Sequence, residues 1–274
     1  MMRHALGEIG RRQLQALAGM RSLYAFDFDG TLTKIMRDRR AVQLSRRVRM
    51  QLNELSRHAP IAIVSGRSLR DLHARVGGDV SYLIGNHGVE GSHELAEVRN
   101  HAQQVCATWK SQVGTRFGNI FRRLRVEVED KTYSLTFHYR AATRKRAARE
   151  AVIDALSELR PSPRIVLGKS SVNALTPGTP NKGGALLKLM ARLGVQHALF
   201  VGDDVTDEDV FGLRDSRIVT VRIGATKNSD AQYFLKRQSE VGDLLQVLLA
   251  AHNGASVPGR SKRGTAGRSE SGAV

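Results

Sequence analysis

Short runs of apolar residues, each ending in a small or polar residue, recur near both ends of the chain. Strands buried on both faces of a sheet have this continuous pattern, whereas half-exposed strands alternate apolar and polar positions. The pattern therefore predicts five buried strands, at residues 23–27, 60–66, 82–86, 198–204 and 218–224.

Helical periodicity fills the segments between these predicted strands. One set of apolar residues recurs at helical spacing: Leu44, Val48, Leu52 and Leu55. Another periodic segment begins at the Gly-Gly pair of residues 183–184. An alternation of strands and helices predicts an α/β fold, in which a parallel sheet carries helices on both faces.

The middle of the chain has a different pattern. Residues 94–116 are predicted to be helical, and two alternating segments then flank the turn signal Asp130-Lys131, as in an antiparallel hairpin. A second helix is predicted over residues 142–159, and a second hairpin around residues 168–170. The order helix, hairpin, helix, hairpin is typical of an α+β unit.

These patterns divide the chain into two predicted domains and a tail. We expect a discontinuous core formed by residues 1–90 and 177–251, with an α+β cap of residues 91–176 inserted into it. Residues 252–274 are rich in Gly and Ser and contain almost no large apolar side chains. A segment of this composition cannot bury enough apolar surface to fold, so we predict a disordered tail.

Composition narrows the class of protein. The chain has 274 residues, of which 41% are hydrophobic, and this is enough for a substantial core. It has one cysteine, Cys106, so an internal disulfide is impossible. No apolar run approaches the roughly 20 residues that a membrane-spanning helix needs, and the N-terminal segment lacks the apolar region of a signal peptide. We therefore expect a cytoplasmic protein without a membrane partner.

The chain is strongly basic, with a formal net charge of +17. The excess is concentrated in blocks at residues 34–49, 116–125 and 140–149. Such charge attracts nucleic acid or any other anionic ligand. Only 5% of the residues are aromatic, however, and the basic blocks are not interleaved with aromatic side chains as a base-stacking surface would be. We interpret the blocks as solvated helix faces and predict no specific nucleic-acid partner.

Polar side chains follow three of the predicted strands. Asp27 and Ser65 end two of them, and the pair Asp203-Asp204 ends a third. Ligands of open parallel sheets bind beyond the carboxyl ends of the strands. Clustered carboxylates require a positive partner, and a site of few oxygen ligands suits Mg²⁺ bound together with phosphate. Lys182, at a predicted helix start, could supply a second positive charge.

The stretch Asp27-Phe28-Asp29-Gly30 is open to other interpretations when it is taken alone. A calcium EF-hand is excluded because Thr31 and Leu32 stand where that loop needs an oxygen ligand and a glycine. The metal-binding D-x-D motif of a sugar-nucleotide transferase remains possible from these residues. A chance pair of turn aspartates is disfavoured once the serine, the lysine and the second acidic pair follow in order.

The ordered motifs DFDGTLT, SGR, a lysine before a helix, and GDD resemble those of the haloacid-dehalogenase-like (HAD) phosphatases. The stretches IGNHGVE, VEDKTYSLTFHYR and GDDVTDEDVF are similar to the trehalose-6-phosphate phosphatase family, and this similarity covers about residues 23–249. The resemblance implies a Rossmann-like core with a parallel sheet and an inserted αββαββ cap of the C2B type. It also implies hydrolysis of trehalose 6-phosphate, a step of trehalose biosynthesis, with Mg²⁺ as the cofactor.

For catalysis, the resemblance implies a nucleophile, an acid–base residue and two groups that hold the phosphate. Asp27 would attack phosphorus and form an aspartyl-phosphate. Asp29 would protonate the leaving sugar oxygen and then deprotonate the attacking water. Lys182 and Ser65 would bind the phosphoryl oxygens and stabilise their charge.

The resemblance also implies how the metal is held. The ligands would be Asp27, Asp29 through its backbone carbonyl, Asp203 and Asp204. Asp207 is expected to help at the metal or to orient Lys182. A magnesium ion at this position would offset the repulsion between the nucleophile and an anionic phosphate.

A larger group of residues is expected to contact the substrate. The candidates near the phosphate are Thr31, Ser65, Gly66 and Arg67. The candidates for the sugar are Asn86 and His87 of the core, and Lys131, His138 and Arg140 of the cap. Asn173 departs from the family pattern, in which a glutamate near this position helps to bind the sugar. This departure leaves the identity of the sugar open.

Three alternative functions remain beside trehalose-6-phosphate hydrolysis. The first two are a phosphatase for another glycosyl phosphate and a sugar phosphomutase. The third is a nucleic-acid-binding protein built on an inactive HAD scaffold, which the net charge suggests and the intact motif set disfavours. We expect a monomer whose partner is a small-molecule sugar phosphate.

Overall fold

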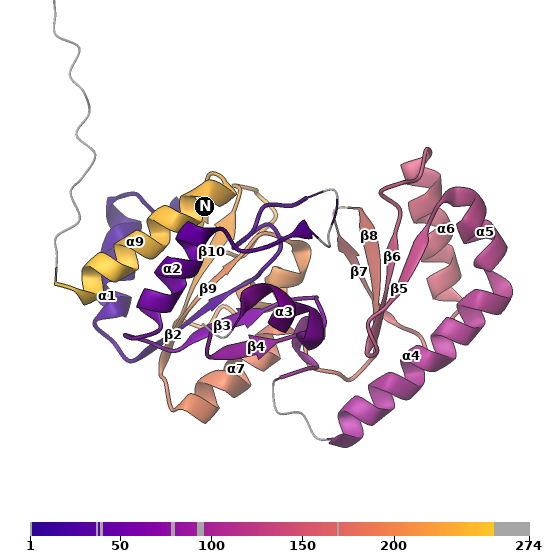
Figure 1. Ribbon diagram of the computed structural model, residues 1–274, viewed down its shortest axis with the longest axis horizontal. Coiled ribbons are helices and arrows are strands. Elements are labelled where there is room, and N and C mark those ends of the chain that lie inside the picture. The colour runs from indigo at the N-terminus through magenta and orange to yellow at the C-terminus, as the bar shows by residue number, and fades with distance from the viewer. Residues whose placement is uncertain are drawn as a thin grey trace, which may run out of the picture.

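Two sheets, each covered by helices, form this protein in a computed structural model that describes residues 2–36, 38, 41–77, 80–91, 96–168 and 170–254 (Figure 1). The strands of the larger sheet are β1 (Arg3–His4), β2 (Ser22–Phe26), β3 (Ile61–Val64), β4 (Tyr82–Ile84), β9 (His197–Gly202), β10 (Ile218–Ile223) and β11 (Tyr233–Leu235). They pair in parallel in the order β1-β11-β10-β9-β2-β3-β4. The α/β prediction with a parallel sheet is therefore confirmed.

Successive residues of the central strands pack into different hydrophobic clusters. Tyr24 and Phe26 of β2 belong to one cluster, and Leu23 and Ala25 belong to another on the opposite face. A strand that is buried on both faces needs apolar residues at every position, which is why the five predicted strands have continuous apolar runs. β1 and β11 were not predicted, because segments of two and three residues are too short to carry a pattern.

Helices cover both faces of the larger sheet (Figure 1). The helices whose buried residues join the cluster of Tyr24 and Phe26 are α1 (Glu8–Ala18), α2 (Arg46–Leu55), α3 (Leu69–Val76) and α9 (Val241–His252). The opposite cluster contains residues of α7 (Lys182–Leu193) and α8 (Glu208–Phe211). α9 includes the first residue of the predicted tail, His252, and the tail from residue 255 onward lies outside the described residues.

The smaller sheet is antiparallel and lies between residues 127 and 175, within the stretch predicted to form the cap. Its strands are β5 (Glu127–Asp130), β6 (Ser134–His138), β7 (Arg164–Gly168) and β8 (Ser171–Leu175), in the order β5-β6-β8-β7. The accompanying helices are α4 (Ala96–Arg116), α5 (Gly118–Leu124) and α6 (Lys145–Ser157). They cover the face that points away from the larger sheet (Figure 1). Both predicted hairpins are present.

Three 3₁₀ turns complete the described elements: η2 (Asn86–Gly88), η3 (Val205–Asp207) and η4 (Gln238–Glu240). The first two lie directly after β4 and β9, at the carboxyl edge of the larger sheet. None of the helices in the described part of the chain combines the length and the apolar character needed to cross a membrane.

Candidate active site

The carboxyl ends of three neighbouring strands meet at the centre of the larger sheet. β2 is followed by Asp27, β3 by Ser65 and β9 by Asp203, and β2 lies between the other two strands. The backbone N–H of Asp27 donates to the carbonyl of Val201 at 2.8 Å, which continues the strand pairing up to the carboxylate. All three polar side chains are buried. Parallel pairing therefore brings together residues that lie far apart in the sequence.

A cleft of about 690 Å³ lies between this edge and the smaller sheet. From the core it is lined by Asp27, Asp29, Ser65, Gly66, Arg67, His87, Lys182, Asp203 and Asp204. From the smaller sheet it is lined by alternate residues of the strands: Glu127, Glu129, Thr136, His138, Ser171 and Asn173. The intervening residues, such as Leu135 and Phe137, pack into the core of the cap. Alternation along the strands thus gives the smaller sheet one polar face, which is turned toward the cleft.

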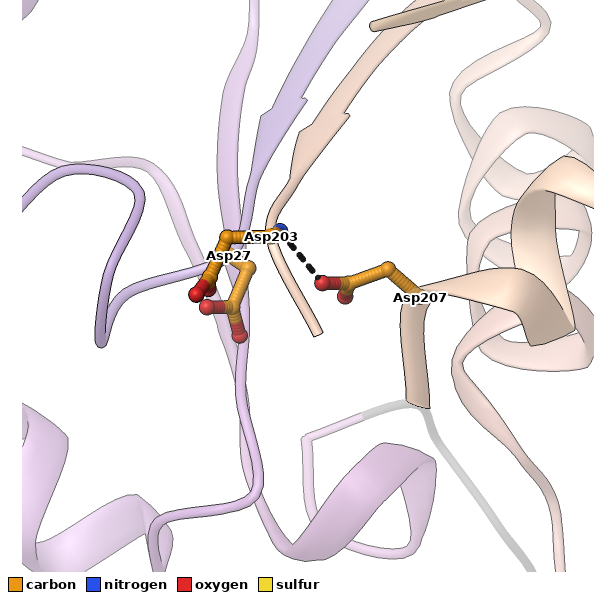
Figure 2. A group of neighbouring side chains, drawn as sticks. All are labelled: Asp27, Asp203 and Asp207. Atoms are coloured by element: carbon orange, nitrogen blue, oxygen red, sulfur yellow. Dashed lines mark hydrogen bonds between the residues drawn. The ribbon is translucent and has the colours of Figure 1, made fainter. Parts of the chain in front are cut away.

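A buried ion-pair network occupies the floor of the cleft. The ammonium group of Lys182 donates to Oδ1 of Asp27 and to Oδ1 of Asp207, both at 2.7 Å. Asp207 also accepts the backbone N–H groups of Asp203 and Asp204 through Oδ2, each at 2.8 Å. Figure 2 shows Asp27 and Asp203 side by side, and Asp207 joined to the Asp203 backbone by the dashed bond. Asp207 therefore orients Lys182, which is one of the two roles predicted for it.

Three carboxylates lie close together in this network. Oxygens of Asp27, Asp203 and Asp207 lie within 4.8 Å of one another, and Lys182 forms ion pairs with Asp27 and Asp207. Burial raises the pKa of Asp27 well above its usual value; Lys182 lowers it, and the negative charges of Asp207 and Asp203 raise it further. A carboxylate in this position is poorly stabilised until another cation approaches.

The residues present fit a magnesium ion. Asp27 and Asp203 both line the cleft and offer carboxylate oxygens, the ligand type that Mg²⁺ prefers. Asp207 completes the carboxylate cluster, but its oxygens already accept three hydrogen bonds. The carboxylate of Asp204 caps η3 by accepting the N–H of Asp207, and it does not belong to the three-carboxylate cluster.

Two glycines allow the acidic groups to approach the backbone this closely. Gly30 has φ +89°, and a Cβ there would lie 2.3 Å from Oδ2 of Asp203. A Cβ on Gly202 would lie 2.3 Å from the carboxylate carbon of Asp207. Only glycine fits at these two positions without moving a carboxylate of the cluster.

Asp29 is held by an arginine from the neighbouring strand end. Arg67 donates to both oxygens of Asp29, from Nε at 2.5 Å and from Nη2 at 2.7 Å. Its third nitrogen, Nη1, donates to Asp71 at 2.5 Å, and Arg75 pairs with the same carboxylate. Arg67 thus links the two carboxylates, and its side chain is 11% exposed. Asp71 was not singled out in the sequence, although its spacing of four residues from Arg75 on helix α3 is a recognisable signal.

Two predicted sugar contacts of the cap, Lys131 and His138, form one polar group with Glu129. His138 shares a hydrogen bond of 2.9 Å with Glu129 through Nε2, and the ammonium group of Lys131 lies 3.9 Å from the same carboxylate. Lys131 also donates to the carbonyl of Gly66 at 2.9 Å, and so reaches the core. Asn173 lines the cleft, but its Oδ1 accepts from Thr136 at 2.8 Å and its Nδ2 donates to a backbone carbonyl.

Other predicted contacts lie at the edge of the cleft or behind its lining. Arg140 is exposed and donates to the carbonyl of Met36 at 2.7 Å, across the mouth of the cleft. Thr31 and Asn86 are buried behind the lining residues, and the hydroxyl of Thr31 donates to Asp203 at 3.4 Å. Their predicted contact with substrate stays a prediction.

His87 lines the cleft in an unusual environment. It has a left-handed backbone (φ 58°), and its ring packs against Gly66, where a Cβ would come within 2.6 Å of Nε2. Both ring nitrogens are buried, and neither has a hydrogen-bond partner in the described part of the chain. Burial lowers the pKa of His87 well below its usual value, and the charges of Lys131, Lys182 and Arg164 lower it further. The imidazole is therefore neutral at physiological pH.

Comparison with known proteins relates this chain to a family of phosphatases. Residues 25–239 match the family model described as trehalose-phosphatase. The chain is 30% identical over 236 residues to a trehalose-phosphate phosphatase of Mycobacterium ulcerans, and the match covers 82% of this chain and 59% of that protein. It is 31% identical over 219 residues to the corresponding protein of Mycobacterium tuberculosis, with coverage of 75% and 54%. The chain thus spans little more than half the length of these curated relatives.

Solved structures show the same fold. The C-terminal domain of trehalose-6-phosphate phosphatase from C. albicans superposes with a TM-score of 0.66 at 22% identity, covering 88% of this chain and 96% of that one. A trehalose-6-phosphate phosphatase of Aspergillus fumigatus superposes with a TM-score of 0.60 at 25% identity, covering 91% and 99%. These likenesses confirm the predicted HAD-type architecture of the core.

Proposed function

Because the chain belongs to the trehalose-phosphatase family, we propose that it is a Mg²⁺-dependent phosphatase that converts trehalose 6-phosphate to trehalose and phosphate through an aspartyl-phosphate on Asp27. The observation that carries this proposal is the buried pair of Asp27 and Lys182 at the floor of a cleft whose roof is polar. The nucleophile is the ionised carboxylate of Asp27, which the ion pair with Lys182 favours, and it needs positive charge to approach a phosphate dianion.

The phosphoryl group would lie among residues of three strand ends. Lys182 donates hydrogen bonds to Asp27 and Asp207, so its ammonium group is oriented toward the attacking oxygen. The hydroxyl of Ser65 accepts the backbone N–H of Arg67 at 3.2 Å, which leaves its own hydrogen available for a phosphoryl oxygen. Both donors would strengthen their bonds as charge spreads over the transferring group.

Proton transfer is assigned to Asp29. It follows the nucleophile by two residues, past the strand end, and its carboxylate is held by Arg67 at the side of the cleft. From there it would protonate the leaving sugar oxygen in the first step and deprotonate water in the second. The bidentate contact with Arg67 orients the ionised carboxylate, which is the form that accepts a proton from water in the second step.

Asp27, Asp203 and the backbone carbonyl of Asp29 would hold the magnesium ion. The ion would supply charge stabilisation for the phosphoryl oxygens and for the acidic cluster. The close approach of three buried carboxylates at the floor supports such a cation.

The sugar would be recognised by the polar face of the smaller sheet, because the floor offers only groups suited to phosphate and metal. Glu129, Lys131 and His138 line this part of the cleft and contact one another. One observation favours a second candidate function, a phosphatase for another glycosyl phosphate. The carboxamide of Asn173 is engaged by Thr136 and by the carbonyl of Val166, and it brings no negative charge toward a sugar.

The test is phosphate release from a panel of sugar phosphates at equal concentration, with Mg²⁺ and with excess EDTA. We expect trehalose 6-phosphate to have the highest kcat/KM, no turnover in EDTA, and recovery when Mg²⁺ is returned. Asp27→Asn serves as the inactive control, because an amide is a poor nucleophile. Full activity in EDTA would remove the metal from the mechanism, and a higher kcat/KM for another glycosyl phosphate would favour the second candidate.

A further inference from the structure

Asn86 connects the smaller sheet to the larger one through its side chain. The residue is 1% exposed, and its carboxamide touches the turn between β5 and β6 from both ends. Nδ2 donates to the carbonyl of Lys131 at 2.9 Å, and Oδ1 accepts the hydroxyl of Ser134 at 2.9 Å. Nδ2 also donates its second hydrogen to the carboxylate of Glu90 at 2.6 Å. Both N–H donors of the carboxamide are thus occupied by protein groups.

On the core side, Asn86 is fixed to the loop after β3. Its backbone N–H donates to the carbonyl of Arg67 at 2.7 Å, and the next N–H, of His87, donates to the carbonyl of Ser65 at 3.0 Å. The carboxylate of Glu90 accepts two hydrogen bonds, one from the side chain of Asn86 and one from the backbone N–H of Leu69 at 2.8 Å. The loop that holds Asn86 is therefore bound to the loop that carries the proposed phosphate contact Ser65.

The turn docked in this way presents Lys131 to the cleft. The Lys131 carbonyl is bound by Asn86, and the ammonium group of the same residue donates to the carbonyl of Gly66 at 2.9 Å. The strands on either side of the turn carry Glu129 and His138, which face the cleft. The position of these three side chains over the floor thus depends on where the turn sits.

We propose that Asn86 is a positioning residue, which docks the turn between β5 and β6 on the core so that Lys131, Glu129 and His138 stand over the phosphate-binding floor. The proposal rests on the proposed function and deepens it, since it assigns part of the discrimination between sugar phosphates to a buried residue without a free N–H. The residue type suits the place, because Asn tolerates the left-handed backbone that Asn86 adopts (φ 48°).

The neighbouring His87 lies at the same junction. Both of its ring nitrogens are buried. Its ring packs on Gly66, the residue whose carbonyl receives Lys131. Three hydrogen bonds of the Asn86 side chain act at the same junction and favour the docked arrangement.

The test compares two substitutions at Asn86 with two controls. Asn86→Asp keeps the shape and the tolerance for positive φ, but it replaces the donor facing Lys131 and Glu90 with an acceptor. Asn86→Gly removes the side chain and keeps the backbone conformation accessible. Ser134→Ala removes one of the docking bonds. Gln51→Ala removes a matched buried carboxamide that donates to the carbonyl of Gly242, remote from the cap.

Hydrogen exchange of the whole chain is the direct measurement. In both Asn86 variants, we expect the amides of residues 127–138 to exchange about 10-fold faster or more, while those of β9 stay unchanged. Ser134→Ala should give a smaller change in the same segment, and Gln51→Ala should give none there. Unchanged exchange of residues 127–138 in both Asn86 variants would overturn the proposal, whatever the enzyme hydrolyses.

Kinetics give the second measurement. For Asn86→Asp, kcat/KM for trehalose 6-phosphate should fall by about 10-fold or more, and turnover of a small aryl phosphate should fall by less than about 3-fold. An equal loss for both substrates would overturn the positioning role, since it would place the effect in the core. If the unmodified protein hydrolyses no phosphate ester, the proposed function is wrong, and the exchange measurement still decides whether Asn86 docks the turn.

Discussion

Replacement of Asp207 by asparagine should damage both stability and turnover, although the residue lies beneath the floor of the cleft. Asp207 is 0% exposed and accepts three hydrogen bonds, from Lys182 and from the backbone N–H groups of Asp203 and Asp204. An asparagine has one accepting oxygen. If that oxygen serves the two N–H groups, its NH₂ faces the ammonium group of Lys182; if it serves Lys182, the two N–H groups lose their acceptor.

The expected losses of stability and turnover in Asp207→Asn follow from these hydrogen bonds. Removing one partner of a buried ion pair costs about 3–5 kcal/mol of the free energy of unfolding. For a protein of this size, each kcal/mol lowers Tm by about 2–4 °C, so the expected decrease is roughly 6–20 °C. Turnover should fall by roughly 100-fold, because Lys182 would no longer be held against Asp27 and small displacements of catalytic groups have effects of this size.

Far-UV circular dichroism in urea is the assay for stability, because the single tryptophan, Trp109, lies in the cap and would report only on that part. Phosphate release measures turnover on the same samples. Asp204→Asn is the matched control for stability: it makes the same chemical change three residues away, and asparagine caps a helix start as well as aspartate does. A free energy of unfolding for Asp207→Asn within about 1 kcal/mol of the unmodified protein, or an equal loss for Asp204→Asn, would refute the reasoning.

Four further predictions concern the cap, the substrate, the pH dependence and the charge. Lys131→Ala should lower kcat/KM for trehalose 6-phosphate by about 10-fold or more and leave a small aryl phosphate much less affected; equal effects would contradict a role in sugar binding. Asn173→Glu should raise kcat/KM for trehalose 6-phosphate, and a decrease would point to another glycosyl phosphate. Burial lowers the pKa of both His87 and His252, the latter also through His58. Because the unfolded chain then binds protons at these histidines that the folded chain does not, their contribution to the free energy of unfolding should fall as pH decreases from about 7 to 5. His252→Gln removes one of the two contributions, so the free energy of unfolding of this variant, measured in urea, should lose less over that range than that of the unmodified protein. Binding to nucleic acid, measured by fluorescence anisotropy at increasing salt, should be weak, salt-sensitive and without sequence preference; salt-resistant, sequence-specific binding would restore the nucleic-acid alternative.

The sequence by itself determined the buried strands and the chemistry at their ends. Continuous apolar runs predicted β2, β3, β4, β9 and β10, because a strand buried on both faces needs apolar side chains at every position. The polar residues that end such strands must share one edge of a parallel sheet, so the meeting of Asp27, Ser65 and Asp203 could also be predicted. The alternating segments in the middle of the chain predicted both hairpins. A strand with one buried face has apolar residues at every second position, because successive side chains point to opposite faces of the sheet.

Only the tertiary structure decided which polar group meets which. In GDDVTDED, the sequence offered several acids with similar surroundings, and the geometry of η3 turns Asp207, and not Asp204, toward Lys182. Asn86 and His87 are adjacent in the chain, yet Asn86 binds the turn between β5 and β6, while His87 lines the cleft and its ring nitrogens have no hydrogen-bond partner among the residues that the structure describes. Burial produces a regular pattern of apolar residues in the sequence, because it determines the polarity needed at every position of a strand. The partner of a single side chain depends on how loops from distant segments approach one another, and no local pattern records that.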